Sequence, residues 1–261
     1  MKPVVLITGA SSGIGSALAK VFAAHGHELA LVARRQDRLE ALADEIAATG
    51  RPRPTVFTAD LERREAASII AAELSSQGLE PAFVVNNAGF GLSGAATALS
   101  RDEQLAMIDV NVRALTELSL MFIDSVARHR GGILNVASLA AFLPGPGMAV
   151  YYASKAYVLS FSEALHRELS GLGVRVTALC PGAVPTEFQA RAGMGRIPGP
   201  RALQLSAERV AQIGYNAFMA GQRVVIAGIG NRIAVSLMRL VPNALILRLA
   251  DQRPRVGKAG K

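Results

Sequence analysis

Short apolar runs alternate with longer amphipathic stretches along most of this chain. Seven runs have the length of buried strands and end in glycine, proline or polar residues; they cover residues 4–7, 27–34, 55–61, 82–89, 133–138, 174–182 and 223–228. Between them, apolar positions recur with helical spacing, at about residues 34–50, 62–77, 101–130, 149–170 and 206–220. Strands that alternate with helices predict an α/β fold built on a parallel sheet.

The composition agrees with a large aliphatic core inside such a sheet. Apolar residues make up 51% of the 261 residues, aromatic residues only 5%, and there is no tryptophan. Parallel sheets that are covered on both faces favour this composition. We expect one domain over residues 1–230, an apolar and basic extension over 231–251, and a disordered tail over 252–261.

The sequence favours a cytoplasmic location. The apolar run at residues 4–7 is too short for a signal peptide, and no stretch of 18 apolar residues suggests a spanning helix. Cys180 has no partner for a disulfide and is interpreted as an inert core residue. No metal site is expected, because none of the four histidines lies in a ligand-like cluster.

The positive charge of the chain is concentrated near its C-terminus. The formal net charge is +8, and residues 231–261 hold seven lysines and arginines against one acid, Asp251. Pro242 interrupts any single helix in this segment. Four roles stay open: packing on the sheet, covering a pocket, contacting another subunit, or resting on an anionic membrane. Nucleic acid is disfavoured, since the charge lies in a short tail without interleaved aromatic residues.

A glycine-rich turn follows the first apolar run. Gly9, Gly13 and Gly15 lie between that run and an amphipathic helix, with the spacing Gly-x-x-x-Gly-x-Gly. Glycines let a ligand approach the backbone, and a helix N-terminus offers free N–H groups to a phosphate. A strand, a glycine turn and a helix in this order predict a dinucleotide site, although the spacing differs from the most common fingerprint.

Basic residues end the second apolar run. NAD-specific sites usually place an acid there for the ribose hydroxyls, whereas this chain has Arg34 and Arg35, with Arg38 one turn further on. A guanidinium group can bind the 2′-phosphate of NADP(H), which a carboxylate would repel. The alternative is a solvated helix start, and the upstream glycine turn favours the NADP(H) site.

The third and fourth runs bring small and polar residues to the same edge of the predicted sheet. Asp60 and Leu61 end the third run, where they can meet an adenine ring, although Asp60 is also a favoured helix N-cap. Asn87, Ala88 and Gly89 end the fourth run and leave room for a ribose. Taken alone, this second group would be interpreted as a structural turn.

A serine, a tyrosine and a lysine form the candidate catalytic group. Ser138 follows the fifth run, and Tyr151 and Lys155 are four residues apart on the next helix, so that their side chains share one face. A nearby ammonium favours the phenolate and should lower the pKa of Tyr151 from its usual value of about 10. Tyr151 would then donate or accept a proton at neutral pH. The alternative is a solvated Tyr–Lys pair of the kind that many helices carry.

Three further features complete the candidate site. Asn111, within the expected helix 101–130, is either a satisfied core amide or a group that holds water near the site. Residues 187–205 mix apolar residues with glycine and proline and are predicted to form a lid over the substrate. The turn after the sixth run can present its backbone and one hydroxyl to an amide-bearing ring; it contains Pro181, Gly182, Val184 and Thr186.

Taken together, these motifs resemble those of the short-chain dehydrogenase/reductase family. The resemblance covers residues 4 to about 228, and the motifs occur in order and at family-like spacing; they are Thr8-Gly9-Ala10-Ser11-Ser12-Gly13-Ile14-Gly15, Asn86-Asn87-Ala88-Gly89, Asn111, Ser138, Tyr151 with Lys155, and Pro181-Gly182 with Thr186. It implies a doubly wound, Rossmann-type parallel sheet with strand order 3-2-1-4-5-6-7, and assembly into dimers or tetramers. The segment Ala33-Arg34-Arg35 resembles the NADPH-preferring branch.

The resemblance also implies a role for each candidate catalytic residue. Tyr151 transfers a proton to or from the substrate oxygen, and Ser138 hydrogen-bonds the carbonyl. Lys155 lowers the pKa of Tyr151 and binds the nicotinamide ribose, while Asn111 holds a water that links Lys155 to solvent. The cofactor gives a hydride to the carbonyl carbon, and the protein supplies positioning and electrostatics.

These observations predict an NADPH-dependent reductase of ketones or aldehydes, which also runs in reverse as an alcohol dehydrogenase. Its expected pocket walls are apolar and favour bulky substrates; they include Phe90, Phe142, Leu143, Met148 and Phe188. One alternative is reduction of sterol-like or long-chain acyl ketones at a membrane surface. Another is an NADP(H)-sensing protein without turnover, against which the intact Ser138, Tyr151 and Lys155 argue.

Overall fold

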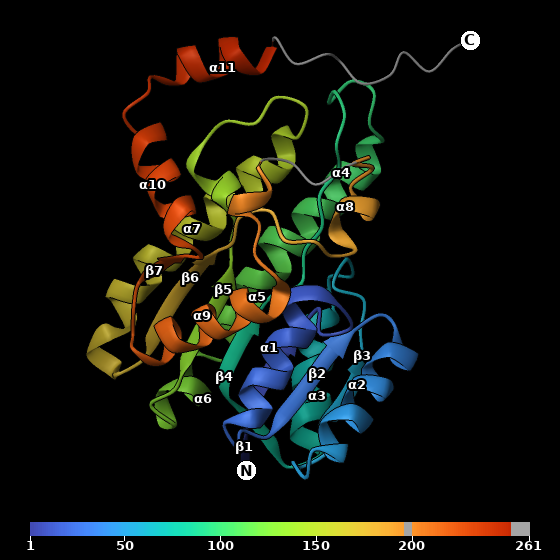
Figure 1. Ribbon diagram of the computed structural model, residues 1–261. Helices are drawn as coiled ribbons and strands as arrows, with labels where there is room; N and C mark the ends of the chain where they lie inside the picture. The colour runs from blue at the N-terminus through green and yellow to red at the C-terminus, as the bar shows by residue number, and fades with distance from the viewer. Residues whose placement is uncertain (196–199, 252–261) are drawn as a thin grey trace.

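The computed structural model describes residues 1–195 and 200–251 and places a parallel sheet between two layers of helices (Figure 1). Its seven strands follow the order β3-β2-β1-β4-β5-β6-β7. The fold class and strand order implied by the resemblance are confirmed. The strands are β1 (Lys2–Thr8), β2 (Leu29–Ala33), β3 (Thr55–Thr58), β4 (Leu79–Asn86), β5 (Gly132–Val136), β6 (Arg175–Cys180) and β7 (Val224–Ile226).

Parallel pairing brings the C-terminal ends of the strands to one edge of the sheet. Thr8 at the end of β1 pairs with Val32 of β2. Asn86 at the end of β4 pairs with Asn135 of β5, and Val136 pairs with Leu179 of β6. The turns that carry the candidate residues therefore lie side by side, at the edge where open α/β sheets bind ligands.

Successive residues of the central strands face opposite helix layers, because side chains alternate along a strand. Val5 and Ile7 pack in one core cluster, and Val4 and Leu6 pack in the other. Both sides of these strands are apolar, which explains why their sequences are continuous apolar runs. The first layer contains α1 (Gly13–Ala24), α2 (Gln36–Ala48) and α9 (Ala207–Met219). The second contains α3 (Ala66–Ser76) and α7 (Ala149–Leu169), with the helical segments between residues 101 and 128.

The long helix expected over residues 101–130 is broken, so this expectation was wrong in its continuity. A π-helical turn, Asp109–Ala114, separates α4 (Arg101–Ile108) from α5 (Leu115–Met121). Phe122, with φ −104° and ψ 11°, then separates α5 from α6 (Ile123–Arg128). Asn111 lies inside the π-helical turn and is fully buried. Such turns occur frequently at functional sites.

Two helices follow the last strand and extend from the edge of the sheet that carries the site (Figure 1). They are α10 (Ile229–Met238) and α11 (Asn243–Asp251), and Pro242 lies between them. Within the described residues, no helix combines the length and apolarity needed to cross a membrane. The tail expected over residues 252–261, and residues 196–199 of the expected lid, lie outside the part of the chain that the structure describes.

Candidate active site

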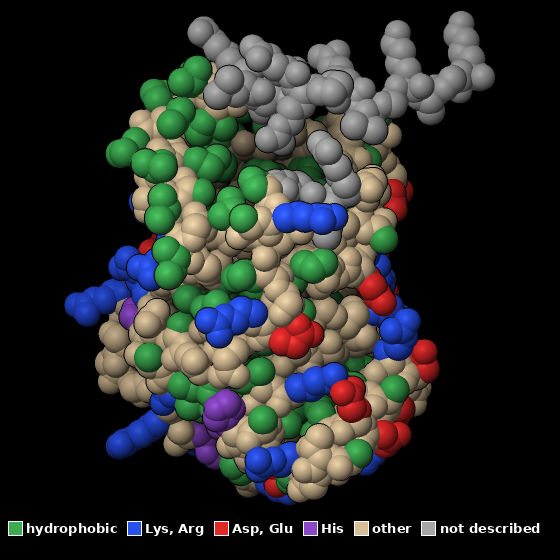
Figure 2. All heavy atoms as spheres, in the orientation of Figure 1, with side chains coloured by type: hydrophobic (Ala, Val, Ile, Leu, Met, Phe, Trp, Pro, Cys, Tyr) green, Lys and Arg blue, Asp and Glu red, His purple; other side chains and the backbone are tan. Residues whose placement is uncertain are grey.

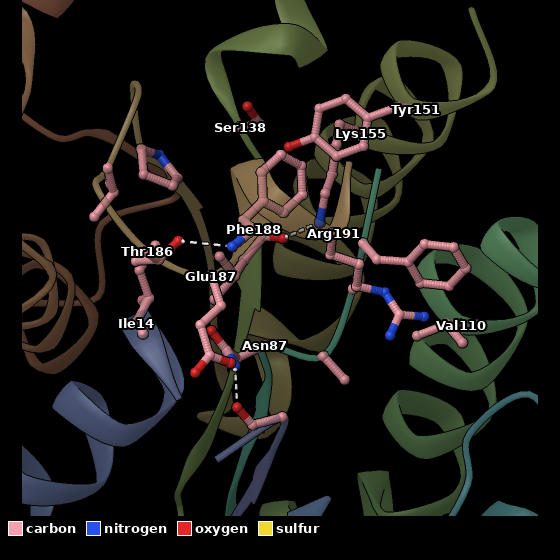
Figure 3. Close-up of a pocket in the computed structure, with 18 of the residues that line it drawn as sticks. Ile14, Asn87, Val110, Ser138, Tyr151, Lys155, Thr186, Glu187, Phe188 and Arg191 are labelled. Carbon is pink, nitrogen blue, oxygen red and sulfur yellow. Dashed lines mark hydrogen bonds between the residues drawn. The ribbon is translucent and has the colours of Figure 1, made fainter. Parts of the chain in front are cut away.

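The turns at the C-terminal edge of the sheet enclose a cavity of about 750 Å³. Figure 3 shows residues from the loop after β5, from α7 and from the segment after β6 converging on it. Most residues expected at the site line this cavity: Gly9, Ser11, Ser12, Gly13, Ile14, Arg34, Arg35, Asp60, Leu61, Asn87, Ala88, Gly89, Ser138, Tyr151, Lys155, Pro181, Gly182, Val184 and Thr186. Four of the expected residues do not line it, namely Thr8, Gly15, Arg38 and Asn111.

The candidate catalytic side chains meet in the cavity. Tyr151 and Lys155 are both buried on α7, and the Tyr151 hydroxyl points toward Ser138 (Figure 3). The Ser138 hydroxyl oxygen accepts a hydrogen bond from the Ala140 N–H at 3.1 Å, which fixes its orientation. Lys155 Nζ donates to the Val136 carbonyl oxygen of β5 at 2.8 Å. The three groups are therefore held on two elements, the end of β5 and the start of α7.

Burial, rather than the neighbouring lysine, dominates the protonation of this group. Desolvation raises the pKa of Tyr151 to about 12, and the Ser138 hydrogen bond offsets only part of this effect. Desolvation also lowers the pKa of Lys155 to about 8. The expectation that spacing alone would bring the tyrosine pKa down was wrong, because removing a phenolate from water outweighs a cation that is bonded to Val136.

The Asn111 side chain connects the π-helical turn to α7 and to the loop after β4. Its amide nitrogen donates to Phe90 O at 3.0 Å and to Ser154 Oγ at 3.0 Å, and its Oδ1 accepts from the Phe90 N–H at 3.1 Å. Ser154 in turn donates to the carbonyl of Tyr151 at 2.7 Å. Asn111 thus connects the backbone at Phe90 to Ser154, the residue before Lys155, as the satisfied core amide that the sequence allowed. Its side-chain donors are used within the protein.

The glycine turn packs directly on the end of β4. Gly9 has φ +65°, and a Cβ there would lie 2.8 Å from Ala88 Cα. A Cβ at Gly15 would overlap the Gly9 carbonyl oxygen. Asn87 Nδ2 donates to Thr8 O at 2.9 Å, and the Thr8 hydroxyl accepts from the Asn87 and Ala88 N–H groups at 3.1 Å each. Thr8 and Gly15 consequently shape the turn from behind the cavity.

The arginines after β2 are paired with acids from two different segments. Arg34 Nη1 lies 2.9 Å from Glu62 Oε1 and 4.0 Å from Asp60 Oδ1, in the turn after β3. Arg35 Nη1 lies 2.7 Å from Glu187 Oε2, and Arg38 Nη1 lies 3.7 Å from Glu187 Oε1. Arg35 Nη2 also donates to the hydroxyls of Ser11 and Ser12, at 3.1 and 3.0 Å.

The cavity walls contain residues that the sequence predicted and others that it did not. Phe188, named as a wall, begins the short helix α8 (Phe188–Arg191) and packs on Tyr151 with ring centroids 5.3 Å apart. Arg191, on the same helix, stacks on Phe90, its guanidinium carbon 4.2 Å from the ring centroid. Phe142 does not line the cavity. Glu187, Arg191 and Met194 line the cavity within the predicted lid, and the lining residues outside the predicted site include Glu62, Val110, Tyr152 and Met238.

The chain is similar to several characterised proteins. A family model for short chain dehydrogenases matches residues 3–196. Sulfoacetaldehyde reductase 2 of Chromohalobacter salexigens is 38% identical over 194 residues, which are 72% of this chain and 75% of that protein. The structure of a short-chain dehydrogenase from Sphingobium yanoikuyae in complex with NADPH gives a TM-score of 0.81 at 31% identity, over 99% of this chain and 98% of that one. The bulky-bulky ketone specific alcohol dehydrogenase from Comamonas testosteroni gives a TM-score of 0.77 at 27% identity, over 100% and 97%.

Proposed function

This chain belongs to the short-chain dehydrogenase family, and on that premise we propose that it is an NADPH-dependent reductase of bulky, apolar ketones or aldehydes, reversible as an alcohol dehydrogenase. At the coarser level it is an oxidoreductase that acts on alcohol or carbonyl groups with NADP(H). The observation that carries the proposal is the convergence of Ser138, Tyr151 and Lys155 in one cavity with the glycine turn and Arg35. A cytoplasmic location and a dimeric or tetrameric assembly stay predictions from the sequence.

The residues around the cavity fit a nicotinamide dinucleotide with a 2′-phosphate. Side chains at Gly9 and Gly13 would crowd Ala88 and Thr186, so the turn requires glycine at these positions. A glycine turn before a helix N-terminus also lets backbone N–H groups approach phosphates. The guanidinium groups of Arg35 and Arg38 and the hydroxyls of Ser11 and Ser12 supply donors suited to a phosphate. Asp60 and Leu61 would flank the adenine, while Pro181, Gly182, Val184 and Thr186 would hold the nicotinamide side.

Bound in this way, the cofactor would supply the hydride that reduces the carbonyl carbon. The chain contributes the rest of the reaction. Ser138 would orient the substrate oxygen by donating a hydrogen bond from its hydroxyl, and Tyr151 would donate the proton that completes the alcohol. Lys155 would stabilise negative charge on the phenol oxygen during this transfer, because a cation acts strongly in a buried site. Asn111 and Ser154 would keep the helix that carries both groups in register with the loop at Phe90.

The walls of the cavity support a bulky, apolar substrate. Phe90, Leu143, Met148, Phe188, Met194 and Met238 line it beside Tyr151. Phe188, Met194 and neighbouring residues of 187–205 would act as the lid, since α8 packs directly on Tyr151. The similarity to a ketone-specific alcohol dehydrogenase supports the same class of substrate.

The proposal is tested by following NADPH consumption, with NADH in parallel, across aryl, cyclic and long-chain ketones. We expect turnover with NADPH on one or more bulky ketones and slower turnover with NADH. Faster turnover with NADH would contradict the assignment of Arg34, Arg35 and Arg38. Tight NADPH binding without turnover on any carbonyl would instead support the NADP(H)-sensing alternative.

A second candidate function is reduction of lipid-like ketones at a membrane, favoured by the surface of α10 and the residues that follow it. Ile229, Ile233, Leu237 and Leu240 are spaced along one stripe and are 56–81% exposed. Figure 2 shows hydrophobic side chains gathered over α10 and α11. We name this stripe the C-terminal apolar face. Met238, on the same helix, lines the cavity, so this surface adjoins the substrate site.

Charge favours an anionic lipid surface as the occupant of the C-terminal apolar face. Arg232 and Arg239 are exposed on α10 and directly after it, and no Asp or Glu occurs between residues 229 and 250. A second copy bound through the same face would place arginines near arginines, whereas anionic lipids would satisfy both the apolar and the cationic groups.

Sedimentation with vesicles of phosphatidylglycerol and phosphatidylcholine tests this second function. We expect the wild type to sediment with vesicles that contain phosphatidylglycerol, and the Ile233→Ser, Leu237→Ser double variant to stay in solution. A matched control is Leu172→Ser, which removes an exposed leucine from another surface. Binding that is unchanged in the double variant, or a dimer in sedimentation velocity that the double variant abolishes, would contradict the membrane assignment.

A further inference from the structure

Glu187 places a carboxylate where the arginine side chains after β2 converge. Its Oε2 lies 2.7 Å from Arg35 Nη1, and its Oε1 lies 3.7 Å from Arg38 Nη1. The Ser12 hydroxyl also hydrogen-bonds the carboxylate. The same serine and Ser11 accept hydrogen bonds from Arg35. The Glu187 carboxylate is therefore bound by the same arginine and serine groups that the proposed function assigns to the 2′-phosphate.

The carboxylate remains ionised at neutral pH. The hydrogen bond from Arg35, together with the charges of Arg35 and Arg38, lowers the pKa of Glu187 below its usual range. The side chains of Arg35 and Glu187 are 42% and 51% exposed, so the pair is solvated and each partner can exchange for another. A phosphate monoester carries about −1.5 to −2 charges and three acceptor oxygens, and it can outcompete one carboxylate for two guanidinium groups.

Arg34 and Arg35 form ion pairs with acids from different parts of the fold. Its acidic partners, Glu62 and Asp60, belong to the turn after β3, which is part of the sheet framework. Glu187 instead belongs to the segment that leads into α8, 152 residues away along the chain from Arg35. Arg191, the last residue of α8, also forms an ion pair, with its Nη2 3.8 Å from Glu62 Oε1. The two ends of α8 therefore contact the residues that surround Arg34 and Arg35.

The same segment contacts the candidate catalytic tyrosine. Phe188 directly follows Glu187, packs on Tyr151, and would meet any side chain placed at Gly91. The Phe188 N–H donates to the Thr186 hydroxyl at 3.3 Å, which keeps residues 186–188 together (Figure 3). Arg35, Glu187, Phe188 and Tyr151 thus form a continuous series of contacts from the phosphate site to the reaction site.

We propose that Glu187 is an internal competitor of the cofactor 2′-phosphate for Arg35 and Arg38, and so determines how strongly the protein prefers NADP(H) over NAD(H). The inference rests on the proposed function, which assigns NADP(H) to this cavity. A cofactor without the 2′-phosphate leaves the pair of Glu187 with Arg35 intact. A cofactor that carries the phosphate must take these guanidinium groups from Glu187, which lowers its net affinity.

Isothermal calorimetry on the Glu187→Gln variant tests this inference, with NADP⁺, NAD⁺, adenosine 2′,5′-bisphosphate and AMP as ligands. Glutamine keeps the size of the side chain and removes its charge. We expect NADP⁺ and adenosine 2′,5′-bisphosphate to bind about two- to fivefold more tightly, within the range of a solvated ion pair. NAD⁺ and AMP should bind with unchanged affinity. A matched control is Glu45→Gln, which removes an exposed carboxylate that pairs with Lys20 away from the cavity.

The outcomes separate this inference from the proposed function. Equal or weaker binding of the 2′-phosphorylated ligands by Glu187→Gln would overturn it, as would equal tightening for all four ligands or the same gain in Glu45→Gln. The gain must also disappear when Glu187→Gln is made in an Arg35→Ala background. Failure of the wild type to bind NADP⁺ would overturn the proposed cofactor, and the inference with it.

Discussion

At the residue scale, the glycines of the first turn are required as much by the protein as by a ligand. A Cβ at Gly15 would overlap Gly9 O and crowd Asn87 Nδ2. We therefore expect Gly15→Ala to lower the free energy of unfolding by about 1–3 kcal/mol through overpacking. Denaturation with urea measures this change. Gly171→Ala is the control, because a Cβ there meets open space. Equal stability of the two variants would show that the turn has more room than the structure gives it.

The buried lysine predicts a pH dependence of catalysis. Lys155 loses its proton as the pH rises through about 8, whereas Tyr151 keeps its proton until about 12. We expect kcat/KM for ketone reduction to fall above about pH 8, since the lost cation no longer stabilises charge on the phenol oxygen. A series of rates at fixed ionic strength measures this profile. A rate that stays constant up to pH 10 would show that the charge of Lys155 is not used.

Loss of the Lys155 proton, which should lower the catalytic rate, should raise the free energy of unfolding. The pKa of Lys155 falls from 10.5 in the unfolded chain to about 8 in the fold, so the unfolded chain binds more protons between these values. The contribution of Lys155 to the free energy of unfolding is therefore unfavourable below about pH 8 and improves as the pH rises toward 10.5. The Lys155→Met variant should lose this rise in urea denaturation. A rise that persists in the variant would assign it to other groups.

Sequence spacing identified the reacting residues but not their protonation. Tyr151 and Lys155 share a face because they are four apart on a helix, and this needs no tertiary information. The direction of the Tyr151 pKa shift depends on how completely the fold buries the ring, which the spacing does not contain. The pairing of Glu187 with Arg35 was not predicted for a related reason, since nothing in the local sequence connects the two residues.

At the element scale, the apolar runs predicted every strand of the sheet. The central strands are the clearest, because strands buried on both faces have no polar side. The break at the π-helical turn Asp109–Ala114 could not be predicted from apolar spacing, which continues across it. Asn111 was the visible signal. A buried amide that bonds to Phe90 and Ser154 explains why the helix departs from regular geometry there.

These bonds predict a structural effect of removing the Asn111 amide. Asn111→Ala leaves the Phe90 N–H and C=O groups buried without partners, and we expect the free energy of unfolding to fall by about 1–3 kcal/mol. Thermal or urea denaturation measures the loss. Asn216→Ala provides the control, because Asn216 is exposed on α9 and its side chain accepts a hydrogen bond from the side chain of Gln212 at the surface. An Asn111 variant as stable as this control would contradict the assigned role.

At the scale of the whole molecule, the sheet brings distant turns to one edge, and the site is a consequence of that arrangement. Strand order could be inferred from the family resemblance, and the described residues confirm it. The shape of the cavity could not be inferred from the sequence. Residues of α8 and α10 form part of its walls, and no local sequence pattern predicts these long-range contacts. Met238 is an example: it lies near the C-terminal end of α10, and it lines the same cavity as the glycine turn after β1.

The central claim is that Tyr151 donates the proton in an NADPH-dependent carbonyl reduction, and Tyr151→Phe tests it most directly. With the best ketone of the panel, we expect NADPH consumption to fall by about 10²- to 10⁴-fold, the usual contribution of a general acid, while NADPH binds with nearly unchanged affinity. Tyr157→Phe, which removes an exposed hydroxyl from the same helix, should keep wild-type activity. Turnover by Tyr151→Phe close to that of Tyr157→Phe would contradict the account.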